Sequence, residues 1–376
     1  MATDKTAEAA EKATYSSISS IDDVLGPGEE RFFGAGFKRA EHSLTAVQIT
    51  GADGVDRLGS VAARAAVGYP ADWSRKAGID QRPHLSTIDV IVIGAQLSEM
   101  LLAHAYGVDR ARRRRMVLRR IHVKAGTRPV EDDLSDFPAA ARVIGTRPVR
   151  AAADTANTAA DTIDGAGGDA AIDLYTTITE CTVGTLRVRL EIRHEMGRTN
   201  PAPGFFGSPD ELLGDARLRL FGAGYKAGRQ LIENIDVDSA GHAARACVRM
   251  LATRRPTGRA DPGDGLAAAP GEGLEATHRA AASPIDGFVI GLQLGQLLLY
   301  ELDRVPRARS NTLWMRETVI DLDLRRRPLP ALAPTTAVLD QPRLLENSKG
   351  EKWRCADIVG EFQGIRLRCS VAHRLP

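Results

Sequence analysis

The sequence has few cysteines and almost no net charge, and each shortage excludes a class of protein. Its four cysteines lie far apart, with no CxxC spacing, so neither a metal site nor a disulfide framework is predicted. The formal net charge of the 376 residues is +2, well below the basic excess of a general nucleic-acid binder. We therefore expect no metal, no cofactor and no nucleic-acid partner.

Long hydrophobic runs are also missing. The longest apolar stretch falls short of the roughly 20 residues that a membrane-spanning helix needs. Residues 1–17 lack the apolar core of a signal peptide and are typical of a disordered leader. Cysteine usage of this kind fits a reducing compartment. The sequence thus predicts a cytoplasmic protein that does not bind a membrane.

What the chain does contain is an internal repeat. Residues 20–38 (SIDDVLGPGEERFFGAGFK) match residues 208–226 (SPDELLGDARLRLFGAGYK) at a constant offset of 188. Residues 86–101 match residues 283–298 at an offset of 197, and a short strand-like run near the end of each half matches at 179. Because the order is kept, the pattern indicates two fused copies of one domain. A site between the copies would draw on both.

Each copy has the same predicted series of elements. A short capped helix is followed by strand-like segments, then by one long helix, then by several more strands. The long helices are apolar nearly all round, so something must wrap each of them. This predicts an α+β fold, a tandem (double) hot-dog in which two antiparallel sheets each wrap one helix. The FGAG glycines are expected to mark a bulge or bend within the first strand.

The same pattern gives the predicted domain boundaries. Two stretches rich in Ala, Gly, Asp and Pro are expected to be surface insertions, at 150–168 and 258–273. The predicted parts are a leader (1–17), a first hot-dog domain (18–199), a linker (200–207) and a second hot-dog domain (208–376).

Two aspartates stand at equivalent places, three residues after the serine that opens each long helix. Asp89 follows Ser86, and Asp286 follows Ser283, so both complete capping boxes. A carboxylate there stabilises the helix and needs no chemistry. The free N–H groups of a buried helix start, beside a carboxylate, also suit the polarisation of a thioester carbonyl and proton transfer. Both interpretations stay open.

Other candidates surround the helix starts. Gln96 and Gln293 lie two turns further along and either bond a wrapping strand or contact substrate. His84 precedes the first long helix, and a loop histidine is either a solvated group or a general base. Glu41 and His42 have Arg229 and Gln230 as their counterparts, so the acid and the histidine occur in one copy only. This difference is expected if one copy keeps the chemistry, and it is also expected from neutral drift.

The FGAG segments contain further candidates for substrate binding. Gly34 and Gly36, with Gly222 and Gly224, lack the third glycine of a dinucleotide fingerprint, and no β-α unit follows them. Lys38 and Lys226 end these segments and are either solvated or able to meet a phosphate or carboxylate.

An arginine-rich run follows the first long helix. Residues 109–120 (DRARRRRMVLRR) carry seven arginines in twelve residues, among them Arg112, Arg113, Arg114 and Arg115. Cations favour a helix C-terminus, which gives a purely structural interpretation. The run would also suit docking of an acidic partner such as an acyl carrier protein.

The run from Ser20 to His42 resembles the opening of the bacterial avirulence protein D (AvrD) family, and the resemblance extends from about residue 18 to the end. It implies synthesis of syringolides, acyl glycoside signals built from a β-ketoacyl chain and a ketopentose. The implied reaction is similar to that of the A-factor type butyrolactone synthases, which are also hot-dog proteins. Hot-dog dehydratases differ, because their HxxxGxxxxP motif is not kept after His122.

Three functions remain open at this stage. The first is an acyl-transfer or condensation enzyme that joins a β-ketoacyl thioester, of coenzyme A or an acyl carrier protein, to a ketopentose-like sugar. The second is a hot-dog dehydratase or thioesterase that acts on acyl thioesters. The third is a non-catalytic protein that binds an acyl ligand. Exposed sheet edges also make a homodimer a possible assembly.

Overall fold

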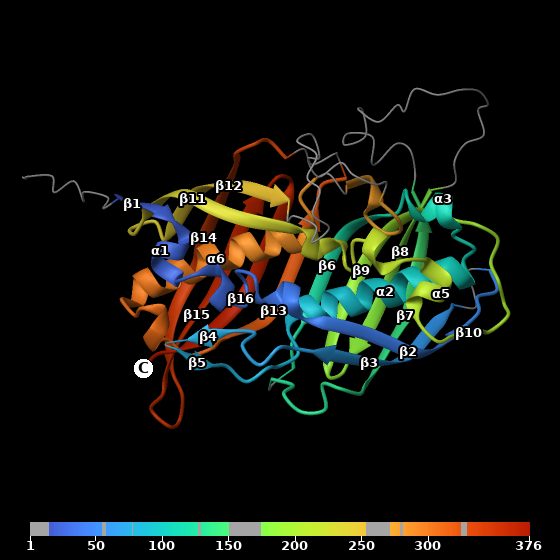
Figure 1. The fold of residues 1–376 in the computed structure, drawn as a ribbon, viewed down its shortest axis with the longest axis horizontal. Helices are drawn as coiled ribbons and strands as arrows, with labels where there is room; N and C mark the ends of the chain where they lie inside the picture. Colours follow the sequence, from blue (N-terminus) through green and yellow to red (C-terminus); the bar gives the residue numbers. More distant parts are fainter. Residues whose placement is uncertain are drawn as a thin grey trace, which may run out of the picture.

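The computed structural model describes residues 15–54, 58–76, 78–126, 129–149, 174–252, 271–278, 281–324 and 329–376. In this part of the chain, two long helices lie along one large curved sheet (Figure 1). The predicted insertion at 150–168, and the one at 258–273 up to residue 270, lie outside the described residues. So does most of the predicted leader, although residues 15–17 begin a strand.

The long helices are α2 (Thr87–Ala105) and α6 (Pro284–Asp303). Each begins with a complete capping box, in which the serine accepts from the aspartate N–H and the aspartate accepts from the serine N–H. The structural interpretation of both aspartates is thus confirmed. Both helices are buried on nearly all sides, as their unbroken apolar sequences require.

Both helices are long and apolar enough, by length and composition alone, to cross a membrane. The most apolar window is 89% buried inside the protein in α2 and 83% buried in α6. This degree of burial is typical of the core helices of a folded domain.

The sheet forms in two matching sets of strands. The set around α2 is antiparallel and runs in spatial order β6, β9, β8, β7, β3, β2, β10, and the set around α6 runs β1, β11, β12, β14, β15, β16, β13. The bounds are β1 (Tyr15–Ser20), β2 (Glu41–Thr50), β3 (Ser60–Gly68), β6 (Val117–Lys124), β7 (Phe137–Pro148), β8 (Leu174–Val183), β9 (Leu186–Glu195), β10 (Gly204–Phe206), β11 (Gly228–Asp238), β12 (Ala243–Ala252), β13 (Leu313–Leu322), β14 (Ala333–Glu346), β15 (Lys352–Phe362) and β16 (Ile365–Arg374).

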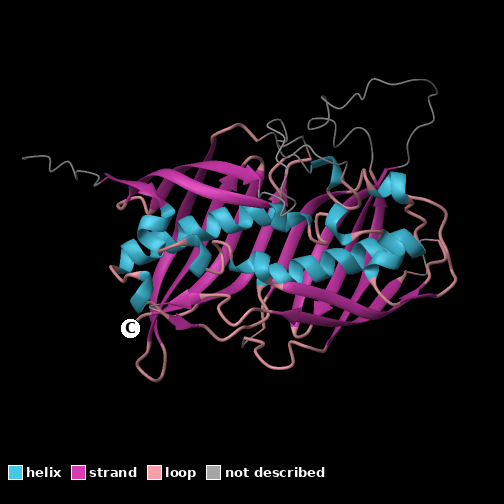
Figure 2. Ribbon diagram, in the orientation of Figure 1, coloured by secondary structure: helices cyan, strands magenta, loops and turns pink. Residues whose placement is uncertain are grey.

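The two sets are joined into one 14-stranded sheet, where two separate sheets were expected. β6 pairs with β13 antiparallel, and Ile121 stands opposite Ile320 in the register. Figure 2 shows the strands as a continuous surface behind both helices. Each set curls around one long buried helix, so the fold is a double hot-dog-like α+β fold.

The short N-terminal elements of the copies are exchanged. β1 pairs with β11, and α1 (Ile21–Leu25) packs on α6, although both belong to the first repeat. In the same way β10 pairs with β2, and α5 (Pro209–Leu213) packs on α2. β10 lies inside the predicted linker. Each copy therefore completes the other's core, and segments 20–40 and 208–228 cross between them.

The FGAG segments do not lie within the strands, as the sequence had indicated. They form tight turns that end in short 3₁₀ helices at Gly36–Arg39 and Gly224–Ala227, and the strands begin after them. A Cβ on Gly34 would overlap the carbonyl oxygen of Gly28, and one on Gly222 would overlap that of Ala216. These glycines are needed for the close approach of two backbone segments.

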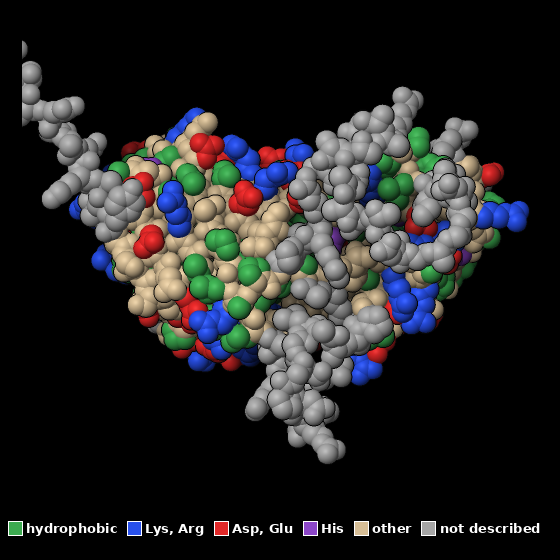
Figure 3. All heavy atoms as spheres, turned by 90° about the horizontal axis from the view of Figure 1, so that it is seen from above, with side chains coloured by type: hydrophobic (Ala, Val, Ile, Leu, Met, Phe, Trp, Pro, Cys, Tyr) green, Lys and Arg blue, Asp and Glu red, His purple; other side chains and the backbone are tan. Residues whose placement is uncertain are grey.

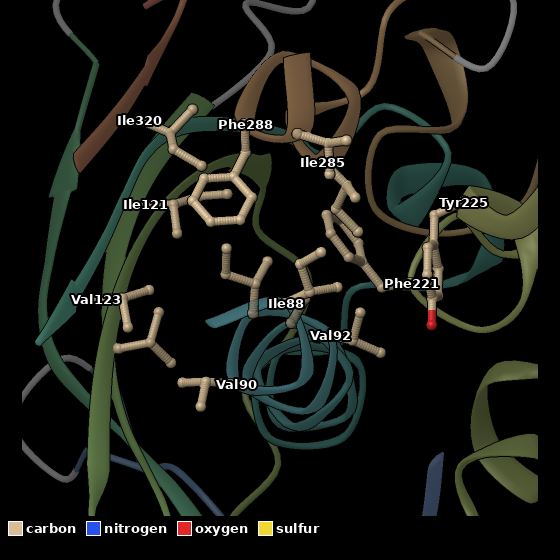
Figure 4. Packing of buried hydrophobic residues seen from close by; sticks show 14 of the residues in the cluster. Ile88, Val90, Val92, Ile121, Val123, Phe221, Tyr225, Ile285, Phe288 and Ile320 are labelled. Carbon is tan, nitrogen blue, oxygen red and sulfur yellow. The ribbon is translucent and has the colours of Figure 1, made fainter. Parts of the chain in front are cut away.

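The starts of the two long helices meet over the β6–β13 junction. Figure 4 shows Ile88 and Val92 of α2 beside Ile285 and Phe288 of α6, with Tyr225 at the edge of the cluster. All four aliphatic and aromatic side chains of the two helices are at most 1% exposed. The capping aspartates of both copies are thereby held close to the interface between them.

Candidate active site

A histidine–carboxylate pair forms at the start of α2. Successive residues of a strand point to opposite faces, so Glu41 points outward from β2 and is 82% exposed, whereas His42 points inward with 3% exposed. His42 Nε2 lies 2.7 Å from Asp89 Oδ1. The structure thus brings together two of the residues that the sequence singled out.

The second carboxylate oxygen of Asp89 accepts hydrogen bonds from the helix cap and from a tyrosine. Ser86 N donates at 2.7 Å and Ser86 Oγ at 2.6 Å, and the hydroxyl of Tyr69 also donates to it. Burial raises the pKa of Asp89, but the hydrogen bonds from His42, Ser86 and Tyr69 outweigh it, and the pKa lies below its ordinary value. Asp89 is therefore an anion in the folded protein.

An ionised Asp89 can only accept hydrogen bonds, and this fixes the tautomer of His42. Nε2 carries the proton and donates to Asp89, which leaves the lone pair of Nδ1 available in the neutral ring. Nδ1 faces the hydroxyl of Tyr225 at 3.4 Å. Tyr225 comes from the second repeat and reaches His42 through the exchange of segment 208–228. The pair is thus arranged as a base oriented by a carboxylate.

The second copy keeps the geometry without the histidine. Gln230 occupies the place of His42, and its Nε2 donates to Asp286 Oδ1 at 2.5 Å. Ser283 caps α6 and binds Asp286 as Ser86 binds Asp89. An amide cannot accept a proton near neutral pH, so this half has the same hydrogen-bond framework but lacks a base.

A cavity of about 350 Å³ opens at the start of α2 and is lined by residues of both copies; His42 and Asp89 themselves do not line it. Its lining includes Ser86 and Thr87, from the start of α2, and Tyr300 and Trp314 from the second copy. Ser86 also binds Asp89, so one residue layer separates the cavity from the carboxylate. His84 lines the cavity as well, and its ring packs edge-to-face on Trp73 at 5.4 Å.

The model of the family "Pseudomonas avirulence D protein (AvrD)" matches this chain over residues 16–167 and 162–376. The chain belongs to the AvrD family. The match spans nearly the whole sequence, including both copies of the repeat, and so confirms the predicted resemblance. No curated protein matches this AvrD family chain.

Solved structures similar to this AvrD chain include a tesB protein of Mycobacterium avium subspecies paratuberculosis, with 9% identity, a TM-score of 0.33, and 84% of this chain and 92% of that chain covered. A thioesterase II structure from Thermobifida fusca has 12% identity and a TM-score of 0.30, with 87% and 95% covered. A dehydratase structure concerned with the borrelidin and fluvirucin polyketide synthases has 10% identity and a TM-score of 0.27, and the match covers 87% of this chain and 97% of that chain. At these TM-scores the likenesses carry no argument, and the fold assignment rests on the chain's own helices and sheet.

The remaining predicted residues of the AvrD chain lie at different places around the pair. Lys38 donates to the carbonyl of Gly228, and burial lowers its pKa to about 8. Lys226 binds Glu41 at 3.1 Å. Gln293 accepts from Arg31 at 2.6 Å, and Gln96 is buried on α2 with 7% exposed. Gly36 and Gly224, like their neighbours Gly34 and Gly222, lie in the crossing turns.

The predicted carrier-docking arginines lie around α3 (Arg110–Arg113), away from the pair and in contact with acidic side chains. Arg112 binds Asp109, Arg113 lies near Glu99 at 3.5 Å, Arg114 binds Glu272, and Arg115 binds Glu195 at 2.5 Å. Arg113 is 7% exposed, so it does not present a surface for docking. On the face shown in Figure 3, basic and acidic side chains are interspersed where described residues are visible.

Two tyrosines of the site, Tyr69 and Tyr225, were not singled out from the sequence. The repeat holds a signal for Tyr225, because its counterpart at offset 188 is Phe37, which lacks the hydroxyl. Tyr69 has no comparable signal and becomes visible through its contact with Asp89. Among the described residues, no group of three or more His, Cys, Asp or Glu side chains is arranged to hold a metal ion.

Proposed function

We propose that this AvrD family member is an acyl-transfer enzyme that joins a β-ketoacyl thioester to a small ketopentose-like sugar. The observation that supports this most is the His42–Asp89 pair, which is present in one copy and sits at the start of a buried helix beside a cavity shared by both copies. The fold leaves the chemistry open, so the proposal rests on these residues.

The proposed reaction has one bond formed and one broken. His42 Nδ1 accepts the proton of a sugar hydroxyl, whose oxygen attacks the thioester carbonyl carbon. The C–O bond forms, the C–S bond breaks, and the proton passes to the departing thiolate. Asp89 keeps His42 in the correct tautomer and stabilises the imidazolium that forms. N–H groups at the start of α2 are suited to stabilise the negative charge on the carbonyl oxygen.

A second candidate uses the same pair with water or a β-hydroxyl group in place of the sugar. A histidine held by a buried carboxylate can activate water for thioester hydrolysis, or remove a proton during dehydration. We keep this thioesterase or dehydratase reaction as the alternative because the pair itself does not select the nucleophile.

We further propose, as parts of the same account, a cytoplasmic location and a thioester of coenzyme A or an acyl carrier protein as the acyl donor. A homodimer is proposed through the exposed edges of the sheet at β1 and β10. These edges are the two ends of the 14-stranded order.

Mass spectrometry of the reaction products tests the proposal. Purified protein is mixed with a β-ketoacyl thioester and a ketopentose, with a sugar-free reaction and the Asp89→Asn and Asp286→Asn variants as controls. We expect a sugar-dependent product at the mass of acyl chain plus sugar, lost in Asp89→Asn and kept in Asp286→Asn. Free acid or an enoyl product without sugar would instead establish the alternative, and intact bound thioester without turnover would indicate a binding protein.

A further inference from the structure

The cavity beside the pair is strongly cationic. Among the described residues that line it, Arg31, Lys76, Arg82, Arg307 and Arg316 are cations, and Glu131 is the one carboxylate. Glu131 is already paired with Arg82. The remaining positive charge comes from both copies, since Arg31 belongs to the first repeat and Arg307 to the second.

Three of these cations have mostly neutral partners. Lys76 Nζ donates to the carbonyl oxygens of Ser310 and Asn311, both at 2.9 Å, and Arg307 donates to that of Arg75 at 2.7 Å. Arg31 is 4% exposed, binds Gln293 and the carboxylate of Asp22, and its buried Nε has no hydrogen-bond partner in the described part of the chain. A buried donor without a partner is costly.

The pKa shifts of these cations agree with an excess of positive charge in the cavity. Burial and, to a smaller extent, the neighbouring charge of Arg307 together lower the pKa of Lys76 to about 8. Burial also lowers the pKa of Arg31 and of Arg307 below the ordinary range, and Arg307 adds to the effect on Arg31 although Asp22 opposes it.

The repeat supplies an internal comparison for this cluster. At the offset of 188 the counterpart of Arg31 is Arg219, and at 197 the counterpart of Arg307 is Arg110. At the same offset of 197, Gln296 corresponds to Glu99 and Arg75 to Glu272. The contacts support this correspondence, because Arg307 binds the backbone of Arg75 and Arg110 binds the carboxylate of Glu272 at 2.8 Å.

The corresponding residues Arg219, Arg110, Glu99 and Glu272 form a second cluster, which we call the closed copy; the cavity lined by Arg31 and Arg307 is the open copy. In the closed copy the cations are neutralised by acidic side chains of the chain itself. Glu272 accepts from Arg110 and Arg114, and Glu99 pairs with Arg113. The space is also closed, because a Cβ on Gly273 would overlap the carboxylate of Glu99. The two copies therefore share the cations Arg31/Arg219 and Arg307/Arg110, but in the open copy the acids at two positions are replaced by Gln296 and Arg75.

We infer that Arg31, Lys76 and Arg307 form a binding site for the phosphate group of a phosphate ester in this cavity. A phosphate dianion would supply the negative charge that Glu99 and Glu272 supply in the closed copy. Its oxygens suit the forked donors of two arginines that approach from opposite copies, together with a lysine. The inference concerns binding and holds whichever reaction the His42–Asp89 pair performs.

Two kinds of compound would bring such a group to the cavity. One is a phosphorylated sugar, and the other is the phosphate of the arm that carries the acyl thioester. Both are phosphate esters, so the site chemistry is shared, and the cavity of about 350 Å³ accepts a small molecule or part of a longer arm.

Calorimetric titration of the full chain with inorganic phosphate tests the site. The decisive variant is Gln296→Glu, which places in the open copy the acid that the closed copy has at Glu99. We expect this variant and Arg307→Gln to bind phosphate at least about tenfold more weakly than the natural chain. The matched control is Arg110→Gln, because Arg110 is the counterpart of Arg307 in the closed copy and its side chain is 68% exposed; we expect unchanged binding.

Circular dichroism and thermal unfolding of each variant verify that it is folded. If phosphate fails to bind the natural chain, or binds the natural chain and the folded Gln296→Glu variant equally, the inference is wrong. Neither readout requires turnover, so a failed phosphate site is distinguishable from a failed acyl-transfer proposal.

A second titration distinguishes the two sources of phosphate. A ketopentose is compared with its phosphate ester, and pantetheine with 4′-phosphopantetheine, each against the natural chain and Gln296→Glu. The ester that uses the site should bind more tightly than its unphosphorylated partner in the natural chain and lose that advantage in the variant. If neither ester shows the advantage, the inference is overturned.

Discussion

The residues that distinguish the two copies lie where chemistry is proposed to occur. His42 and Gln230 have the same position in the repeat and bind equivalent aspartates, yet only the histidine can accept a proton near neutral pH. Likewise Tyr225 replaces Phe37 and places a hydroxyl 3.4 Å from His42 Nδ1. Single substitutions between the copies are thus the basis of the proposal that one copy holds the reacting site.

Lys76 gives the cavity a pH dependence. Its pKa of about 8 means that the side chain is charged below that pH and loses its charge as the pH rises, beside Arg307 and the buried His373. A phosphate monoester, whose second pKa is about 6, is mainly a dianion over this range, so we expect the affinity of such an ester for the natural chain to fall between about pH 7 and about pH 9. Calorimetric titration at several pH values measures this change.

The control for this pH dependence is Lys76→Arg, because arginine keeps its charge throughout the range. We expect the variant to show a nearly constant affinity for the ester. An identical decline in the natural chain and in Lys76→Arg would show that Lys76 is not the group responsible.

At this scale the sequence predicted part of the site. His42 could be singled out because the other copy has a glutamine at its place, and Asp89 because it stands three residues after the serine that opens α2. Glu41 was singled out with His42, but its side chain points away from Asp89. Tyr69 and Arg307 could not, since their roles follow from contacts between segments far apart in the chain. Local patterns do not show which distant segments meet.

Among the elements, the long helices could be predicted because their sequence signals are local. The capping serines and aspartates predicted both helix starts, and the apolar sequences predicted complete burial. The FGAG glycines were wrongly placed inside strands, because a glycine in a strand-like run indicates a bulge as readily as a close approach of two backbones. The segment that approaches is not visible in the local sequence.

Close packing of helix on sheet gives a prediction for α2 and α6. A Cβ on Gly94 would lie 2.6 Å from Val188 Cγ1, and one on Gly291 would lie 2.7 Å from Leu367 Cδ2. We therefore expect Gly94→Val and Gly291→Val each to lower the free energy of unfolding by about 1–3 kcal/mol, measured by denaturant unfolding.

The control for this packing is Gly145→Ala, where an added Cβ meets no atom within 4 Å. We expect it to change the free energy of unfolding by about 0.5 kcal/mol or less. Equal effects of the helix variants and of the control would contradict the packing account.

In the whole molecule, the exchange of N-terminal segments ties the two copies together. α1 belongs to the first repeat but packs on α6, and α5 belongs to the second but packs on α2. The sequence did not predict this exchange, because a segment has the same amphipathic pattern whether it packs on its own copy or on the other. The same crossing brings Tyr225 to His42 and lets one cavity draw on both copies.

The exchange predicts which copy loses hydrogen-exchange protection when a core residue of α1 or α5 is substituted. Leu25 in α1 and Leu213 in α5 are counterparts at offset 188 and are 1% and 3% exposed. We expect Leu25→Asp to lower hydrogen-exchange protection mainly in α6 and β11, and Leu213→Asp to lower it mainly in α2 and β2, because a charge buried without a partner opens the neighbouring core. Protection lost in the variant's own repeat would contradict the exchanged arrangement.

The most direct test of the central claim, that one copy performs the chemistry, is to exchange the residues that distinguish the copies. Product formation from a β-ketoacyl thioester and a ketopentose is measured by mass spectrometry for the natural chain, His42→Gln and Gln230→His. His42→Gln adopts the hydrogen bond that Gln230 makes, so it should stay folded and yet lose about 100-fold or more in rate, whereas Gln230→His should stay within a few-fold. Near-natural rates in folded His42→Gln, or equal losses in both variants, would contradict the account.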